Sequence, residues 1–124
     1  GIVVVGSFDG DLYAIDAHTG VQRWRFAGGR DPAIHNQVGF QSSPAIVDGV
    51  VYVGCRDAQL YAIELATGKE KWRIDHAGSW VNASPAVARG NVYYATSDST
   101  QFNVVDAATG RQVARHDTRA YVFS

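Results

Sequence analysis

Residues 60–68 read LYAIELATG, and residues 12–20 read LYAIDAHTG. Residues 102–110, FNVVDAATG, are a third and looser copy. Self-similarity of this kind indicates a repeat protein, in which each copy is one structural unit that stacks on the next. A residue found in all three copies is therefore expected to build the repeat. Functional residues are expected where the copies differ.

The repeating unit is about 42 residues long, since Gly68 and Gly110 are 42 residues apart. Trp24 and Trp72 are 48 residues apart, which places extra residues between the first two copies. Each unit carries four short β-rich runs separated by Gly, Asp, Ser and Thr. In the second copy these runs, here called strands A to D, are residues 43–47, 50–55, 60–64 and 70–74.

Four antiparallel strands per unit, repeated along the chain, are typical of β-propeller blades. We therefore predict an all-β fold, an arc of three four-stranded antiparallel blades that is part of a propeller of about six to eight blades. The expected bounds are about 1–27 for blade 1, which lacks strand A, about 40–75 for blade 2 and about 82–117 for blade 3, with 118–124 leading into a next blade.

The turns of the repeat have recognisable chemistry. Asp48-Gly49 between strands A and B is a two-residue hairpin signal, because both residues tolerate positive φ. Each turn between strands C and D begins with an acidic residue and ends with Gly. The carboxylate can accept the free N–H groups of the turn, and Gly supplies the left-handed conformation. A calcium loop is disfavoured because each turn has one carboxylate, whereas calcium needs six to eight oxygens.

The composition limits the function classes. The chain has 124 residues, a net charge of −1, 46% hydrophobic and 19% charged residues, which indicates one ordered globular domain. The charge balance offers no footprint for nucleic acid or an anionic membrane, and no apolar run is long enough to span a bilayer. Cys55 is the single cysteine, so an internal disulfide is excluded, and it is expected to be a small buried residue.

The repeat resembles that of the pyrroloquinoline-quinone (PQQ)-type β-propellers, the tryptophan-docking family. The resemblance rests on small, acidic, Thr, Gly and Trp positions that recur in register: Ala14, Asp16, Thr19, Gly20 and Trp24, then Ala62, Glu64, Thr67, Gly68 and Trp72, then Asp106, Thr109 and Gly110. In that family the strand-D Trp packs on the small strand-C residue and on the neighbouring blade. The third copy departs from the pattern, with Ala114 in place of Trp and Val104 in place of Ala.

The family resemblance implies several functions. Some members are PQQ-dependent dehydrogenases that bind the quinone and calcium near the propeller axis beneath two adjacent cysteines. Others bind no cofactor, such as the scaffold lipoprotein of the bacterial outer-membrane barrel-assembly machinery and the sensor ectodomains of some bacterial Ser/Thr kinases. With Cys55 alone, we expect this chain to be a non-catalytic scaffold that binds proteins and holds no cofactor itself. The resemblance implies a bacterial protein in the periplasm or another extracytoplasmic compartment. A dehydrogenase fragment and a kinase ectodomain remain the alternatives.

The copies differ most in the D–A and B–C links. Because successive strands run in opposite directions, these links are expected to lie on the same face. Long loops on a rigid scaffold are where binding usually occurs. We expect the partner-binding loops to include Arg30, Asp31, His35, Asn36, Phe40, Arg56, His76 and Trp80. Trp80 is interpreted either as a core plug between blades or as an exposed anchor. The aligned Asp9, Asp57 and Asp98 favour turn capping.

The two ends of the chain suggest open edges. Copy one begins at strand B, and residues 121–124 resemble the run that leads into strand A of the other copies. Unpaired strand edges and apolar blade faces are normally paired or covered. We therefore expect either the remaining blades of a longer parent chain or edge-to-edge self-association, and favour the first.

Overall fold

Eleven strands form three antiparallel sheets in the described part of the chain, which in this computed structural model comprises residues 1–7, 9–28, 39–40, 42–76, 80–81, 83–97 and 101–117. The strands are β1 (Ile2–Gly6), β2 (Asp11–Asp16), β3 (Gln22–Ala27), β4 (Ala45–Val47), β5 (Val50–Gly54), β6 (Gln59–Glu64), β7 (Glu70–Asp75), β8 (Ala86–Ala88), β9 (Asn91–Ala95), β10 (Gln101–Asp106) and β11 (Gln112–Asp117). These residues contain no helix, and so none that could cross a membrane.

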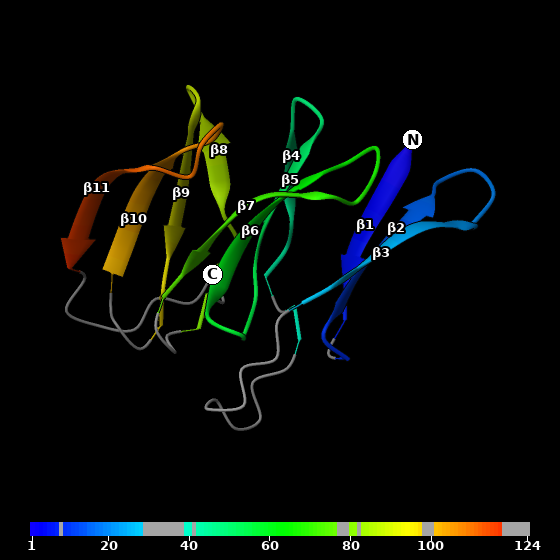
Figure 1. The fold of residues 1–124 in the computed structure, drawn as a ribbon, viewed down its shortest axis with the longest axis horizontal. Coiled ribbons are helices and arrows are strands. Elements are labelled where there is room, and N and C mark those ends of the chain that lie inside the picture. Colours follow the sequence, from blue (N-terminus) through cyan, green and yellow to red (C-terminus); the bar gives the residue numbers. More distant parts are fainter. Residues whose placement is uncertain are drawn as a thin grey trace.

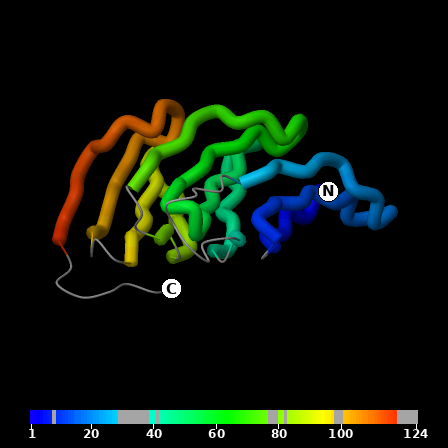
Figure 2. The backbone as a smooth tube through the Cα atoms, turned by 60° about the horizontal axis from the view of Figure 1, so that its bottom comes forward, coloured from blue at the N-terminus to red at the C-terminus, as the bar shows by residue number. Residues whose placement is uncertain are grey.

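The sheets are blade 1 (β1-β2-β3), blade 2 (β4-β5-β6-β7) and blade 3 (β8-β9-β10-β11), each with its strands in sequence order. They follow one another side by side as an arc (Figures 1 and 2), and β4 contacts β8, the first strand of the next blade. The predicted all-β arc of propeller blades is confirmed. Blade 1 has three strands in the described residues, and they correspond to the second, third and fourth strands of the repeat.

The A–B hairpins have the predicted geometry. Asp48 and Gly49 have φ values of 51° and 76°, and Arg89 and Gly90 have φ values of 52° and 77°. Positive φ at both central residues is the type I′ turn, whose twist matches that of the flanking strands. The short turn therefore fixes the pairing of β4 with β5 and of β8 with β9.

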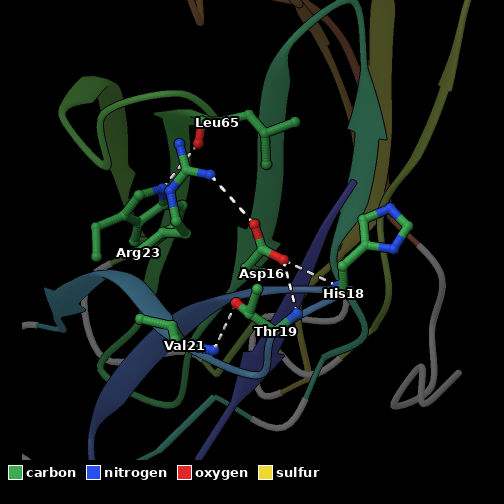
Figure 3. A network of polar contacts seen from close by, with 7 residues as sticks. Asp16, His18, Thr19, Val21, Arg23 and Leu65 are labelled. Carbon is green, nitrogen blue, oxygen red and sulfur yellow. Dashed lines mark hydrogen bonds and ion pairs between the residues drawn. The ribbon is translucent and has the colours of Figure 1, made fainter.

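The C–D turns are closed by their acidic residue (Figure 3). One carboxylate oxygen of Asp16 accepts the backbone N–H groups of Thr19 and His18, both at 2.9 Å, and these bonds hold the pKa of Asp16 below its ordinary value. The Asp106 carboxylate accepts the equivalent amides in blade 3. Gly20 is the last residue of the turn and has a φ of 74°. The Asp and Gly of the repeat thus act together on one turn, as expected from side-chain acceptors and left-handed glycines.

The strand-D tryptophans join neighbouring blades. Trp24 lies opposite Ala14 in the ladder of blade 1, is 8% exposed and donates its Nε1–H to the Leu65 carbonyl of blade 2 at 2.7 Å. Trp72 lies opposite Ala62, is partly buried and donates to the Ala107 carbonyl of blade 3 at 3.0 Å. A buried indole needs a partner for its N–H. The repeat meets this need by placing the Trp beneath the turn of the next blade.

In blade 3 the large and small side chains of this cross-strand pair are exchanged, as predicted. Val104 lies opposite Ala114 in the β10–β11 ladder, so the large residue is on the inner strand and the small one on the outer strand. Val104 is buried, whereas Ala114 is partly exposed. Because Ala114 cannot donate a hydrogen bond, this blade has no side-chain donor at the position from which Trp24 and Trp72 reach the next blade.

An apolar face of blade 1 is open to solvent. Val3 and Val5 on β1 are 49% and 46% exposed, whereas Val51 and Val53, at the same positions of blade 2, are fully buried by blade 1. Exposed apolar patches of this kind mark surfaces that another element covers.

We expect the isolated 124-residue chain to associate through this face at tens of micromolar. Light scattering measures the mass, and a Val3→Lys, Val5→Lys variant is expected to shift the population toward monomer because charge is excluded from apolar contacts. The matched control Val21→Lys changes an exposed valine outside this face and should leave the mass unchanged. A wild-type chain that stays monomeric would contradict the prediction.

Candidate functional site

The links between strands separate onto two sides of the arc. The A–B and C–D turns lie on one side, and the β5–β6 turn, residues 55–58, lies on the other (Figure 1). We call this second side the loop face and define it by residues 55–58, 76, 80–81 and 96–97. The predicted binding residues Arg30, Asp31, His35 and Asn36 lie outside the described residues.

A stacked pair is the most distinctive feature of the loop face. The Arg56 guanidinium carbon lies 4.0 Å from the centroid of the Trp80 ring, and both side chains are partly exposed. The Trp80 carbonyl accepts the backbone N–H of Ser97 at 2.9 Å, so Trp80 connects the β5–β6 turn of blade 2 with blade 3. Cation–π contacts contribute about 0.5–1 kcal/mol at exposed sites. This contact could not be predicted from the sequence, because the two residues are 24 positions apart in different links.

Arg56 has unused hydrogen-bonding capacity. Its backbone N–H is satisfied by the Gly39 carbonyl at 3.0 Å, but its buried Nε has no partner among the described residues. Partly exposed Arg and Trp side chains held in one arrangement are the residue types that dominate binding energy at protein interfaces. The pair can therefore offer a partner both an aromatic surface and a positively charged guanidinium.

The aligned aspartates cap the B–C turns. Asp57 accepts the Gln59 N–H at 3.0 Å and the Tyr61 hydroxyl, and Asp9 accepts the Asp11 N–H and the Tyr13 hydroxyl at 2.9 and 2.6 Å. The Tyr13 hydroxyl, followed by the Asp11 amide, holds the pKa of Asp9 below its ordinary value. Both carboxylates are engaged in building their turns, and Asp98 lies outside the described residues.

Phe40 corrects one expectation for the binding loops. It is 4% exposed, and its ring lies 5.9 Å from that of Tyr61 between blades 1 and 2. A Cβ on Gly6 would lie 2.5 Å from the Phe40 Cβ, so the phenylalanine packs directly on the backbone of β1. Phe40 is therefore a core residue. The repeat contained the signal, because Phe40 and the buried Val81 both stand three residues before a Ser-Pro pair.

His76 is packed between blades 2 and 3. Its Nε2 lies 2.8 Å from the hydroxyl of Tyr94, and the two rings meet edge to face. Burial holds the pKa of His76 below its ordinary value, with the nearby Asp75 opposing this shift. Burial also raises the pKa of Tyr94. At neutral pH the contact therefore joins an uncharged imidazole to an uncharged phenol.

The lowered pKa of His76 predicts that acid destabilises the fold. As the pH falls below 6.5, the ordinary pKa of histidine, the unfolded chain binds a proton at position 76 and the folded chain does not. The free energy of unfolding therefore falls with pH until the pH reaches the lower pKa of His76 in the folded chain. Urea unfolding between pH 7.5 and 5.5 should show this loss in the wild type. The loss should be smaller in His76→Gln and unchanged in the control His116→Gln, which alters an exposed histidine. Equal pH dependence of His76→Gln and wild type would contradict the assignment.

Cys55 and the possible metal ligands are the groups in the described residues with the clearest potential for chemistry. Burial raises the pKa of the Cys55 thiol to about 12, so it is protonated at neutral pH, and it donates to the Gly39 carbonyl at 3.2 Å. Cys55 thus has the structural role expected of a buried thiol. Among these residues, no three His, Cys, Asp or Glu side chains come together as a metal site would require.

The sequence matches, over residues 8–120, the family described as outer membrane protein assembly factor BamB. No curated protein matches it. Among solved structures, BamB from Moraxella catarrhalis is 20% identical with a TM-score of 0.76 over 94% of this chain and 33% of its own. Quinohemoprotein alcohol dehydrogenase from Comamonas testosteroni is 27% identical with a TM-score of 0.76 over 94% of this chain and 19% of its own. The computationally designed Ika4 protein is 25% identical with a TM-score of 0.81 over 98% of this chain and 71% of its own. The chain thus spans a third or less of the two natural proteins.

Proposed function

The chain belongs to the family of outer membrane protein assembly factor BamB, PQQ-type β-propeller repeat proteins, and on this premise we propose that it is a non-catalytic, extracytoplasmic scaffold that binds protein partners through its loop face. The observation that carries the proposal is the family match over residues 8–120. Fold alone does not decide function, so the residues on the loop face must supply the binding chemistry.

The loop face supports a binding role. Arg56 and Trp80 form a partly exposed stacked pair on it, and the turn that carries Arg56 is fixed by the Asp57 bonds to Tyr61 and Gln59. A pair held in place by its own scaffold loses little conformational freedom when a partner binds. The strand-D tryptophans contribute indirectly, because we propose that their contacts hold successive blades, and so successive loops, in one orientation.

Site-specific photo-crosslinking in the host cell tests this role. A photoreactive residue at position 75, an exposed residue at the loop-face end of β7, leaves the Arg56–Trp80 pair intact and is expected to give a cross-linked product with a distinct protein, identified by mass spectrometry. The matched control at position 21 lies on an exposed residue next to a C–D turn, on the opposite side, and should not give that product. Trp80→Ala should weaken the cross-link. A product of equal yield from both positions, or none from position 75, would overturn the proposal.

A second candidate is a segment of a PQQ-dependent dehydrogenase. It is favoured by the 27% identity to the quinohemoprotein alcohol dehydrogenase from Comamonas testosteroni. The described residues do not by themselves fit calcium and quinone, since they bring no cluster of three carboxylate, histidine or cysteine side chains together. Titration of the full-length protein with PQQ and calcium distinguishes the two. Stoichiometric quinone binding with a change in absorbance would favour the dehydrogenase, and its absence the scaffold.

A further inference from the structure

A cavity of about 180 Å³ lies between the outer strand of blade 2 and the facing side of blade 3. Its wall includes Ile74 and His76 from blade 2 and Tyr94, Asn103, Val105 and Arg115 from blade 3. Neither Arg56 nor Trp80 lines the cavity, but His76 belongs both to its wall and to the loop face. Its wall combines the apolar residues Ile74 and Val105 with the polar residues Asn103 and Arg115.

The corresponding space between blades 1 and 2 is filled by aromatic side chains. There Phe26 meets the buried Tyr61 edge to face at 5.0 Å, and Arg73 lies over the Tyr61 ring at 5.5 Å. In the next interface Ile74 stands at the Phe26 position and Asn103 at the Tyr61 position. Two smaller side chains thus replace two rings, and the packing that closes one interface leaves the other open.

Asn103 is a buried polar group with an unmet donor. Its side chain is 2% exposed, its Oδ1 accepts from Gln112 Nε2 at 3.4 Å, and its Nδ2 has no hydrogen-bond partner among the described residues. Tyr61, at the same repeat position, is satisfied by its bond to Asp57. Buried polar groups in folded proteins are normally hydrogen-bonded, so an unmet donor at a cavity wall calls for a partner inside the cavity.

Arg115 lacks the acidic partners that the equivalent arginines of blades 1 and 2, Arg25 and Arg73, have within the described residues. Arg25 pairs with Asp11 at 3.5 Å, and Arg73 pairs with Glu70 at 2.8 Å and covers the Tyr61 ring. Arg115 makes no ion pair within the described residues, because Gln101 and Gln112 stand where the acidic partners would be. The wall also holds the exposed side chain of Asp75.

We propose that this cavity binds a small aliphatic carboxylate, held by the Arg115 guanidinium and the Asn103 Nδ2 amide, with its chain against Ile74 and Val105. Arginine and amide donors are suited to the two oxygens of a carboxylate. A cavity of about 150 Å³ holds benzene, with its six non-hydrogen atoms, so about 180 Å³ admits a ligand of roughly that size. The His76–Tyr94 pair forms part of the polar wall and can hydrogen-bond a hydroxyl on the ligand. The site is distinct from the Arg56–Trp80 pair, which does not line it, and meets the loop face at His76.

Calorimetric titration of the full-length protein with butyrate tests the proposal, with butyramide as the uncharged analogue of the same size. We expect butyrate to bind with a dissociation constant of about 1 mM or lower and butyramide at least tenfold more weakly, a difference of about 1.4 kcal/mol. No heat of binding with butyrate at 20 mM, about 20 times the expected constant, would overturn the site. Equal affinity for butyramide would overturn the assignment to a carboxylate.

Two variants locate the site. Arg115→Ala should weaken butyrate binding at least tenfold, whereas the matched control Arg73→Ala removes the same residue from the filled interface and should leave binding unchanged. Asn103→Tyr restores the ring found at position 61 and should abolish binding by filling the cavity. Arg115 is exposed, so its variant is expected to fold even if Asn103→Tyr does not. Unchanged affinity in Arg115→Ala, or equal losses in the two arginine variants, would place the ligand elsewhere.

Discussion

Replacing Trp24 with Ala is expected to lower the free energy of unfolding by about 3–5 kcal/mol, the range measured for large aromatic truncations in protein cores. Trp24 is 8% exposed and packs between Ala14 of its own blade and the C–D turn of blade 2. Its removal opens a cavity between two blades and leaves the Leu65 carbonyl without the indole donor at 2.7 Å. Urea unfolding followed by circular dichroism measures the change.

A graded series separates the two contributions of Trp24. Trp24→Phe keeps most of the ring but removes the donor, and should cost about 1–3 kcal/mol, the desolvation penalty of an unsatisfied group. Val21→Ala, at a residue that is 61% exposed on the neighbouring turn, should change stability by less than about 0.5 kcal/mol. A loss below about 1 kcal/mol in Trp24→Ala would mean that the indole does not hold the blades together.

The second large effect is expected at Gly68. Its φ is +77°, and a Cβ there would lie 2.7 Å from the Cδ2 of Trp24, which is part of a rigid ring. Gly68→Ala should therefore cost about 1–2 kcal/mol for the left-handed backbone and about 1–3 kcal/mol more for overpacking against the indole. The glycine serves two purposes. It adopts the left-handed conformation that ends the turn, and its lack of a side chain makes room for the tryptophan of the preceding blade.

Gly20 provides a matched control for Gly68. Its φ is +74°, but nothing lies within 4 Å of a Cβ placed there, so Gly20→Ala should show only the backbone cost of about 1–2 kcal/mol. In a double-mutant cycle, Trp24→Ala should remove the overpacking component of Gly68→Ala and give a coupling of about 1–3 kcal/mol. Equal costs at Gly20 and Gly68 would show that the indole is not in contact with the turn.

Local signals predicted most of the fold. The hairpin residues Asp48 and Gly49 and the turn residues Asp16 and Gly20 determine backbone geometry within a few positions, so sequence alone located these turns. Recurrence in register then predicted the blades and their order. The small residue opposite each Trp was also readable, because Ala14 and Trp24 are partners across one ladder.

The candidate site was less accessible to sequence reasoning. Phe40 was assigned to the binding loops, although its match with Val81 already indicated a core position. The Arg56–Trp80 stack joins two links, and the Asn103 cavity results from two substitutions in different blades, Ile74 for Phe26 and Asn103 for Tyr61. Each of these depends on which surfaces meet when blades stack.

The sequence by itself determined the repeat, the strand pairing within each blade and the family, because turns and cross-strand pairs depend on residues close together in the chain. Only the tertiary structure decided which side chains are buried between blades, which donor is left unmet and where space remains. Packing between blades depends on the shapes of two surfaces at once. The same repeat position is therefore a filled contact at Tyr61 and the wall of a cavity at Asn103.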